Sequence, residues 1–133
     1  MSVESTREVV TRYLDSEHSD TSVLADDVVF TTMATGEEYR GPEAVSEMLN
    51  YSYHVSFDAH AERRNLVIDD GVGVLDGYFV GEHIGEFAGI PATNKHVRVP
   101  LCVVYELEND KIKRGRVYFE MPALFQQLGV EAS

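Results

Sequence analysis

HVRVPLCVVYELE, residues 96–108, is the stretch that decides the fold. Every second residue from Val97 to Leu107 is apolar or aromatic, so in an extended chain these side chains share one face. The opposite face mixes charged and apolar side chains, and a half-apolar face is unfavourable in water. We therefore expect a long strand with one face in the core and the other in a dimer interface. Pro100 lacks a backbone N–H, which predicts a bulge or an edge there.

Other strands flank this one along the chain. The turn signals Asp69-Asp70-Gly71 and Asn109-Asp110 separate apolar stretches, as in β-hairpins. The predicted strands are 28–34, 61–69, 72–84, 96–108 and 111–120. Helical spacing predicts a first helix over 4–18, a second from Gly41-Pro42 and a short last helix over 122–128. This order predicts an α+β fold with a mostly antiparallel sheet and a cavity between sheet and helices.

The first predicted helix carries a start signal. Ser5 followed three residues later by Glu8 fits a capping box, in which each side chain bonds the other residue's backbone. The last helix opens at Pro122 and is followed by Gly129, which are typical starting and ending residues.

Composition limits the classes of function. The 133 residues fit a single domain, 1–133, and the net charge of −12 argues against nucleic acid and anionic membranes as partners. The single cysteine, Cys102, excludes an internal disulfide framework. No apolar run is long enough to cross a bilayer, and the polar N-terminus is unlike a signal peptide, so we expect a cytoplasmic protein. Three lysines among 11 basic residues fit either salt adaptation or an ordinary acidic surface.

Two ionisable residues are candidates for chemistry. Glu120 ends the last predicted strand on the face of Arg116 and Tyr118, immediately before a helix. It is either an acid–base group pointing into a cavity or a helix cap, and pairing with Arg116 would make it structural. His83, flanked by Gly81 and Gly85, is either a hydrogen-bonded structural group or a catalytic one.

Neither a metal nor an organic cofactor is predicted. The five histidines lie in separate segments without metal-ligand spacing. Neither of the glycine-rich patterns that bind nucleotide phosphates occurs.

Three stretches resemble one family. GPEAVSEML (41–49), GEHIGEFAGIPATNKHVRV (81–99) and KIKRGRVYFEMPALFQQLG (111–129) are similar to segments of the SnoaL-like polyketide cyclases, within the nuclear transport factor 2-like superfamily. The order and spacing hold over residues 5–129. The resemblance implies a cone-shaped, strongly curved sheet wrapped around the N-terminal helices, a deep apolar pocket and homodimers formed through the sheet.

The resemblance also implies an activity. The family's defining members close a ring of a polyketide ester by intramolecular aldol condensation, without a cofactor. Their catalytic aspartate falls on Glu120 and their histidine on His83, so glutamate here replaces aspartate. Asn94 replaces a loop glycine, although asparagine tolerates a positive φ. The ligand is expected to be a small apolar or polycyclic carbonyl or ester compound. The candidate substrate-binding residues are Tyr118, Arg116, Tyr105, Tyr53 and Phe87.

Two other functions stay open. The same pocket would serve a non-catalytic binding protein in which Glu120 only caps the last helix. The scaffold also supports other cofactor-free reactions, namely ketosteroid-type isomerisation or epoxide hydrolysis. For epoxide hydrolysis Asp76 and Arg98 are the residues to consider, although they match no motif.

Overall fold

The computed structural model describes residues 1–130 and contains a six-stranded sheet with three α-helices. The helices are α1 (Val3–Asp15), α2 (Pro42–Asn50) and α3 (Met121–Leu128), with a 3₁₀ turn η1 (Thr21–Val23) and a π-helical turn η2 (Tyr51–Val55). The strands are β1 (Leu24–Thr32), β2 (Glu37–Arg40), β3 (Phe57–Asp69), β4 (Val72–His83), β5 (His96–Glu108) and β6 (Lys111–Phe119). The predicted α+β class is confirmed.

The sheet is mixed, with strand order β2-β1-β6-β5-β4-β3. All neighbouring pairs are antiparallel except β1 and β6, which run parallel although the chain between them is long. Strand β2 was not predicted, because its sequence EEYR is short and charged. It pairs with β1 at the edge of the sheet, where its backbone needs only one partner strand.

Strand β5 has the two faces that its sequence predicts. Its inward side chains, from Val97 to Leu107, are all buried. Pro100 lies in an internal strand without a bulge, which differs from expectation. The reason is that β6 ends at Phe119, opposite Leu101, and the Pro100 carbonyl instead accepts a hydrogen bond from the Glu120 N–H. Pro100 has no N–H, but its nitrogen faces the point where β6 has already ended. No hydrogen bond between the two strands is therefore lost.

Helix α1 packs its apolar stripe on the inner face of the sheet. Val10 and Tyr13 are fully buried there. The capping box lies three residues earlier than predicted. Ser2 is the N-cap and exchanges hydrogen bonds with Ser5, in place of the predicted pair Ser5 and Glu8. The helix also ends earlier than predicted, at Asp15, so that His18 lies in the following loop.

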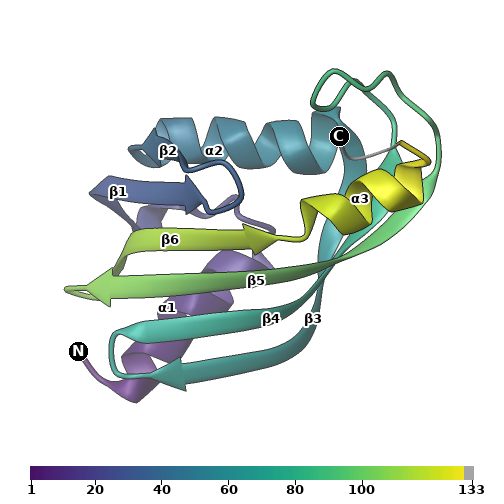
Figure 1. The fold of residues 1–133 in the computed structure, drawn as a ribbon. Helices are drawn as coiled ribbons and strands as arrows, with labels where there is room; N and C mark the ends of the chain where they lie inside the picture. The colour runs from purple at the N-terminus through teal and green to yellow at the C-terminus, as the bar shows by residue number, and fades with distance from the viewer. Residues whose placement is uncertain (131–133) are drawn as a thin grey trace.

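The sheet curves strongly around its inner face. In Figure 1 strands β3, β4 and β5 bend at one end, so that β3 rises toward the end of α2 while α3 lies against the end of β5. Within residues 1–130, no helix is both long and apolar enough to span a bilayer. The homodimer through the outer face of the sheet stays a prediction.

Gly115 on β6 has no side chain, and the ring of Phe30 occupies the space that a side chain there would need. A Cβ at this position would lie 2.7–2.9 Å from three ring atoms of Phe30, which is buried on β1. We expect Gly115→Ala to lower the free energy of unfolding by about 1–3 kcal/mol, because overpacking displaces the ring. Urea unfolding of Gly115→Ala, Phe30→Leu and the double variant tests this. The double variant should be more stable than the sum of the single effects predicts, and simple additivity would contradict the account.

Candidate functional site

A large apolar cavity, here called the main cavity, lies between the inner face of the sheet and helix α2. Its volume is about 580 Å³, within the range of small-molecule sites. Strands β4 and β5 provide Phe79, Leu101 and Tyr105, and α2 provides Met48. The loop between β4 and β5 (84–95) contributes Phe87 at the far side. The cavity exists because the curved inner face is wider than the helices that cover it.

Aromatic rings form much of the wall and hold one another in place. Phe79 packs against Tyr53, Phe57 and Phe119, with ring centroids 4.9, 5.1 and 5.4 Å away. Phe57 in turn packs against Phe87 at 5.4 Å. Edge-to-face and tilted aromatic contacts of this kind stabilise a wall of fixed shape. The cavity is therefore suited to a flat, apolar ligand.

Three buried tyrosines lie close together at the inner end of the main cavity. Tyr53 and Tyr105 line it, and the Tyr13 ring packs edge-on against Tyr105 at 6.4 Å. The Tyr13 hydroxyl is buried without a hydrogen-bond partner among the described residues. Burial raises the pKa of all three phenols well above the usual value, so they stay protonated. They are neutral donors without an acceptor in the part of the chain that is described.

His18 lines the same end of the cavity. Its ring packs against Tyr13 at 5.1 Å and Tyr53 at 5.3 Å. Burial, and to a smaller extent the neighbouring His54, lowers the pKa of His18 from 6.5 to about 4. The imidazole is therefore neutral at pH 7. No sequence pattern points to His18, because only the early end of α1 and the turn after it bring this ring to the cavity.

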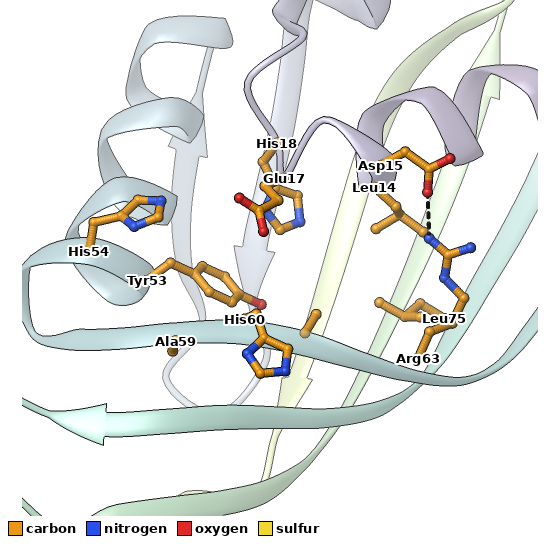
Figure 2. Close-up of a pocket in the computed structure, with 11 residues that line it drawn as sticks. Leu14, Asp15, Glu17, His18, Tyr53, His54, Ala59, His60, Arg63 and Leu75 are labelled. Atoms are coloured by element: carbon orange, nitrogen blue, oxygen red, sulfur yellow. Dashed lines mark hydrogen bonds and ion pairs between the residues drawn. The ribbon is translucent and has the colours of Figure 1, made fainter.

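A smaller, more polar cavity, here called the polar chamber, adjoins the main one. It measures about 260 Å³ and lies between the end of α1, η2 and β3. Figure 2 shows His18 and Tyr53 facing this space from different elements, with the Asp15–Arg63 ion pair (3.1 Å) to one side. His18, Tyr53 and Leu75 line both spaces and so form the partition between them.

Carboxylates at the main cavity lie at its rim. Glu37 is exposed and accepts a 3.0 Å hydrogen bond from the Tyr39 hydroxyl. Glu47 on α2 is also exposed. The Tyr51 hydroxyl donates to the Glu86 carbonyl and carboxylate, both at 3.0 Å, which ties η2 to the 84–95 loop. These acidic groups are solvated or already paired.

His83 does not line the main cavity. It is fully buried at the end of β4, where the Thr93 backbone N–H donates to its Nδ1 at 3.2 Å and the Thr93 hydroxyl lies 3.0 Å away. Its ring packs on Phe57 at 5.0 Å, and its Nε2 has no partner among the described residues. Asn94 adopts the positive φ, 58°, that the replaced glycine would take. His83 thus anchors the loop that carries Phe87.

Glu120 and its strand neighbours lie on the other side of the sheet. Glu120 is the exposed N-cap residue of α3, and its side chain makes no capping hydrogen bond. It lines a shallow outer depression together with Tyr118 and Asp76. Arg116 pairs with Glu106 at 3.1 Å rather than with Glu120. Of the residues singled out in the sequence, the structure brings Tyr53, Tyr105 and Phe87 together in the main cavity. It places Tyr118, Arg116 and Glu120 outside it.

Asp76 and Arg98 do not form a pair of their own. The Asp76 carboxylate accepts hydrogen bonds from Arg64 at 3.0 and 3.2 Å, whereas Arg98 pairs with Glu62 at 2.7 Å. Asp76 lines the outer depression, and Arg98 lies over the Tyr78 ring, 3.6 Å from its centroid. The main cavity therefore has no aspartate–arginine arrangement among its described lining residues.

The first prediction of this site concerns the loop anchor. We expect His83→Phe to lower the free energy of unfolding by about 1–3 kcal/mol, because the Thr93 N–H loses its acceptor inside the protein. Amide hydrogen exchange should accelerate within residues 85–95. Thr93→Val is the matched control, because it removes only the hydroxyl and keeps the backbone donor. Unchanged protection of the loop in His83→Phe would contradict the anchoring role.

The second prediction is a pH dependence of stability. The unfolded chain binds the His18 proton more tightly than the folded protein, so stability should fall as pH decreases from about 6.5 toward the folded pKa of about 4. Between pH 7 and pH 4.5 this residue should account for at most about 3 kcal/mol of lost stability. Urea unfolding of the wild type, His18→Asn and the exposed control His96→Gln measures the difference. Only His18→Asn should show a shallower decline, and equal declines would contradict the burial of a neutral imidazole.

The comparisons with known proteins agree with this architecture. The family model of the SnoaL-like polyketide cyclases matches residues 8–128. No curated protein matches the sequence. A solved structure from Jannaschia sp. CCS1, described as a "putative SnoaL-like polyketide cyclase", is 14% identical, with 97% of this chain and 94% of that chain covered and a TM-score of 0.84.

Two further solved structures have the same fold. A "putative polyketide cyclase" from Xanthomonas campestris pv. campestris is 16% identical, with 95% of this chain and 98% of that chain covered and a TM-score of 0.83. A protein from Catenulispora acidiphila with a ketosteroid isomerase-like fold, in complex with trimethylamine, is 15% identical. There 93% of this chain and 94% of that chain are covered, with a TM-score of 0.76. The chain therefore belongs to the SnoaL-like polyketide cyclase family and has the nuclear transport factor 2-like fold of its relatives.

Proposed function

We propose that the main cavity binds a small apolar carbonyl or ester compound and catalyses cofactor-independent acid–base chemistry of the intramolecular aldol type. One observation carries the proposal. Buried, protonated tyrosines without acceptors among the described residues lie at the inner end of an apolar cavity of about 580 Å³. An apolar wall favours a carbon-rich ligand, and the free donors favour an oxygen on it.

The reaction requires a place for developing negative charge. In an aldol cyclisation a base removes a proton from the carbon next to a carbonyl, and the C–H electron pair moves into the enolate. The enolate carbon then forms a C–C bond to a second carbonyl carbon, whose oxygen takes up the proton. The hydroxyls of Tyr53 and Tyr105 are suited to donate to the enolate oxygen, because preorganised donors act strongly in a site that excludes water.

The position of Glu120 favours a second function. The resemblance implies that this carboxylate is the acid–base group, yet it is exposed on the opposite side of the sheet from the main cavity. A protein that only binds an apolar metabolite would need the cavity and not Glu120. Binding without proton transfer would therefore point to a carrier or sensor rather than to an enzyme.

Proton transfer can be tested without knowledge of the natural substrate. We expect the wild type to accelerate deuterium incorporation at the α-carbon of ethyl benzoylacetate in D₂O, measured by NMR against buffer alone. Tyr105→Phe should lower the protein-catalysed rate by roughly 100-fold, the loss typical for one donor to a developing oxyanion. The matched control is Tyr78→Phe, a hydroxyl on the outer face between Arg64 and Arg98.

Binding is followed separately with 2-naphthol by its fluorescence. Binding of 2-naphthol without any accelerated exchange would favour the non-catalytic function. Equal rates in Tyr105→Phe and Tyr78→Phe would contradict the role of the buried phenols. A wild type that does not bind 2-naphthol would contradict the main cavity as the site.

A further inference from the structure

His18 combines features that no other described lining residue of the main cavity shares. It is the one histidine among them, and its ring separates the apolar main cavity from the polar chamber. Burial and the neighbouring His54 account for the lowered pKa of His18, and no described side chain contributes to it through a hydrogen bond. Its backbone N–H is bonded to the Tyr13 carbonyl at 3.0 Å, and its ring nitrogens make no side-chain hydrogen bond within residues 1–130.

The loop after α1 holds this ring in a left-handed backbone conformation. Glu17 and His18 adopt φ values of 54° and 66°, a region in which asparagine, aspartate and histidine are enriched among the residues other than glycine. The aromatic rings of Tyr13 and Tyr53 pack on the imidazole from two different elements and fix its position.

We propose that His18 is the catalytic base of the main cavity, which accepts the proton from the carbon acid and later returns it. This inference rests on the proposed function and names the base that the proposed function leaves open. A ring nitrogen of His18 takes the proton next to the carbonyl, and the C–H electron pair becomes the enolate. Tyr53 and Tyr105 hold the enolate oxygen. After the C–C bond has formed, the imidazolium returns the proton to the new alkoxide.

The surroundings of His18 suit a base that is neutral at rest. The chamber side gives one edge of the ring access to solvent, while the cavity side faces apolar walls and phenols. Arg63 is paired with Asp15, and the Glu17 carboxylate lines the same chamber. The titratable and charged groups around the imidazole are Tyr13 and Asp15 from α1, Glu17 from the loop, Tyr53 and His54 from η2, and His60 and Arg63 from β3.

Elimination of 5-nitrobenzisoxazole tests the base directly. A base removes the ring C–H proton, the C–H electron pair forms a nitrile, the N–O bond breaks and a coloured nitrophenolate is released. No oxidant or cofactor takes part, and the flat aromatic probe suits the main cavity. We expect a wild-type rate above that of free imidazole at equal concentration. Because the pKa of His18 is about 4, the rate should rise near that pH and stay level from pH 5 to pH 8.

The variant of choice is His18→Asn, because asparagine accepts the left-handed backbone that His18 adopts. It should lose at least 100-fold in the elimination rate while it keeps its affinity for 2-naphthol, which shows that the cavity is intact. Added imidazole should restore part of the rate in His18→Asn, a rescue that a merely structural residue would not allow. His96→Gln, at an exposed position on β5, is the matched control and should keep the wild-type rate.

The outcomes separate the two proposals. Loss of the elimination rate in His18→Asn with retained 2-naphthol binding supports His18 as the base. A wild-type rate in His18→Asn, or a loss confined to Glu120→Gln, overturns it and leaves the proposed function standing. Binding of 2-naphthol without turnover in the wild type also overturns the role of His18. If the wild type does not bind 2-naphthol at all, the proposed function itself fails.

Discussion

The burial of the inner face of β5 is the constraint on which the rest of the structure depends. Every second side chain from Val97 to Leu107 has to leave water, and the neighbouring strands extend the same apolar surface on both sides. Helix α1 covers part of this surface with Val10 and Tyr13, and α2 lies over another part. The curved sheet exposes more inner surface than these helices cover, and the remainder becomes the wall of the main cavity. Core and binding site are thus two portions of one sheet face.

The chemistry of the site follows from the same burial. Phenols and an imidazole in an apolar setting favour their neutral forms, because desolvation penalises the charged ones. Neutral tyrosines remain donors, and a neutral histidine remains an acceptor at pH 7. The carboxylates of this acidic chain lie instead at the rim or on the outer face, where water or arginine stabilises their charge. The protein therefore places donors and a candidate base inside without burying a net charge.

Family membership and site geometry lead to different assignments for the acid–base group. The resemblance points to Glu120 and His83, whereas the structure places Glu120 at the start of α3 on the outer side and uses His83 to anchor the 84–95 loop. The three candidates that do meet, Tyr53, Tyr105 and Phe87, lie on η2, β5 and that loop. A shared fold transfers the cavity between relatives more readily than it transfers the residues that act in it.

Local pattern was sufficient for the α+β class, for the inward face of β5 and for five of the six strands, whose ends lie within four residues of the predicted ones. It was sufficient because alternation and turn residues act over short distances. It missed β2, whose charged residues form a strand only because β1 offers an edge. It also missed His18, since the end of α1 at Asp15 and two left-handed residues bring that ring between Tyr13 and Tyr53. Alternation correctly placed Glu120 on the face of Arg116 and Tyr118, and the structure keeps Glu120 and Tyr118 together in the outer depression. Which of the two faces of β6 turns toward the cavity was decided only by the fold, because that depends on where the helices pack against the sheet.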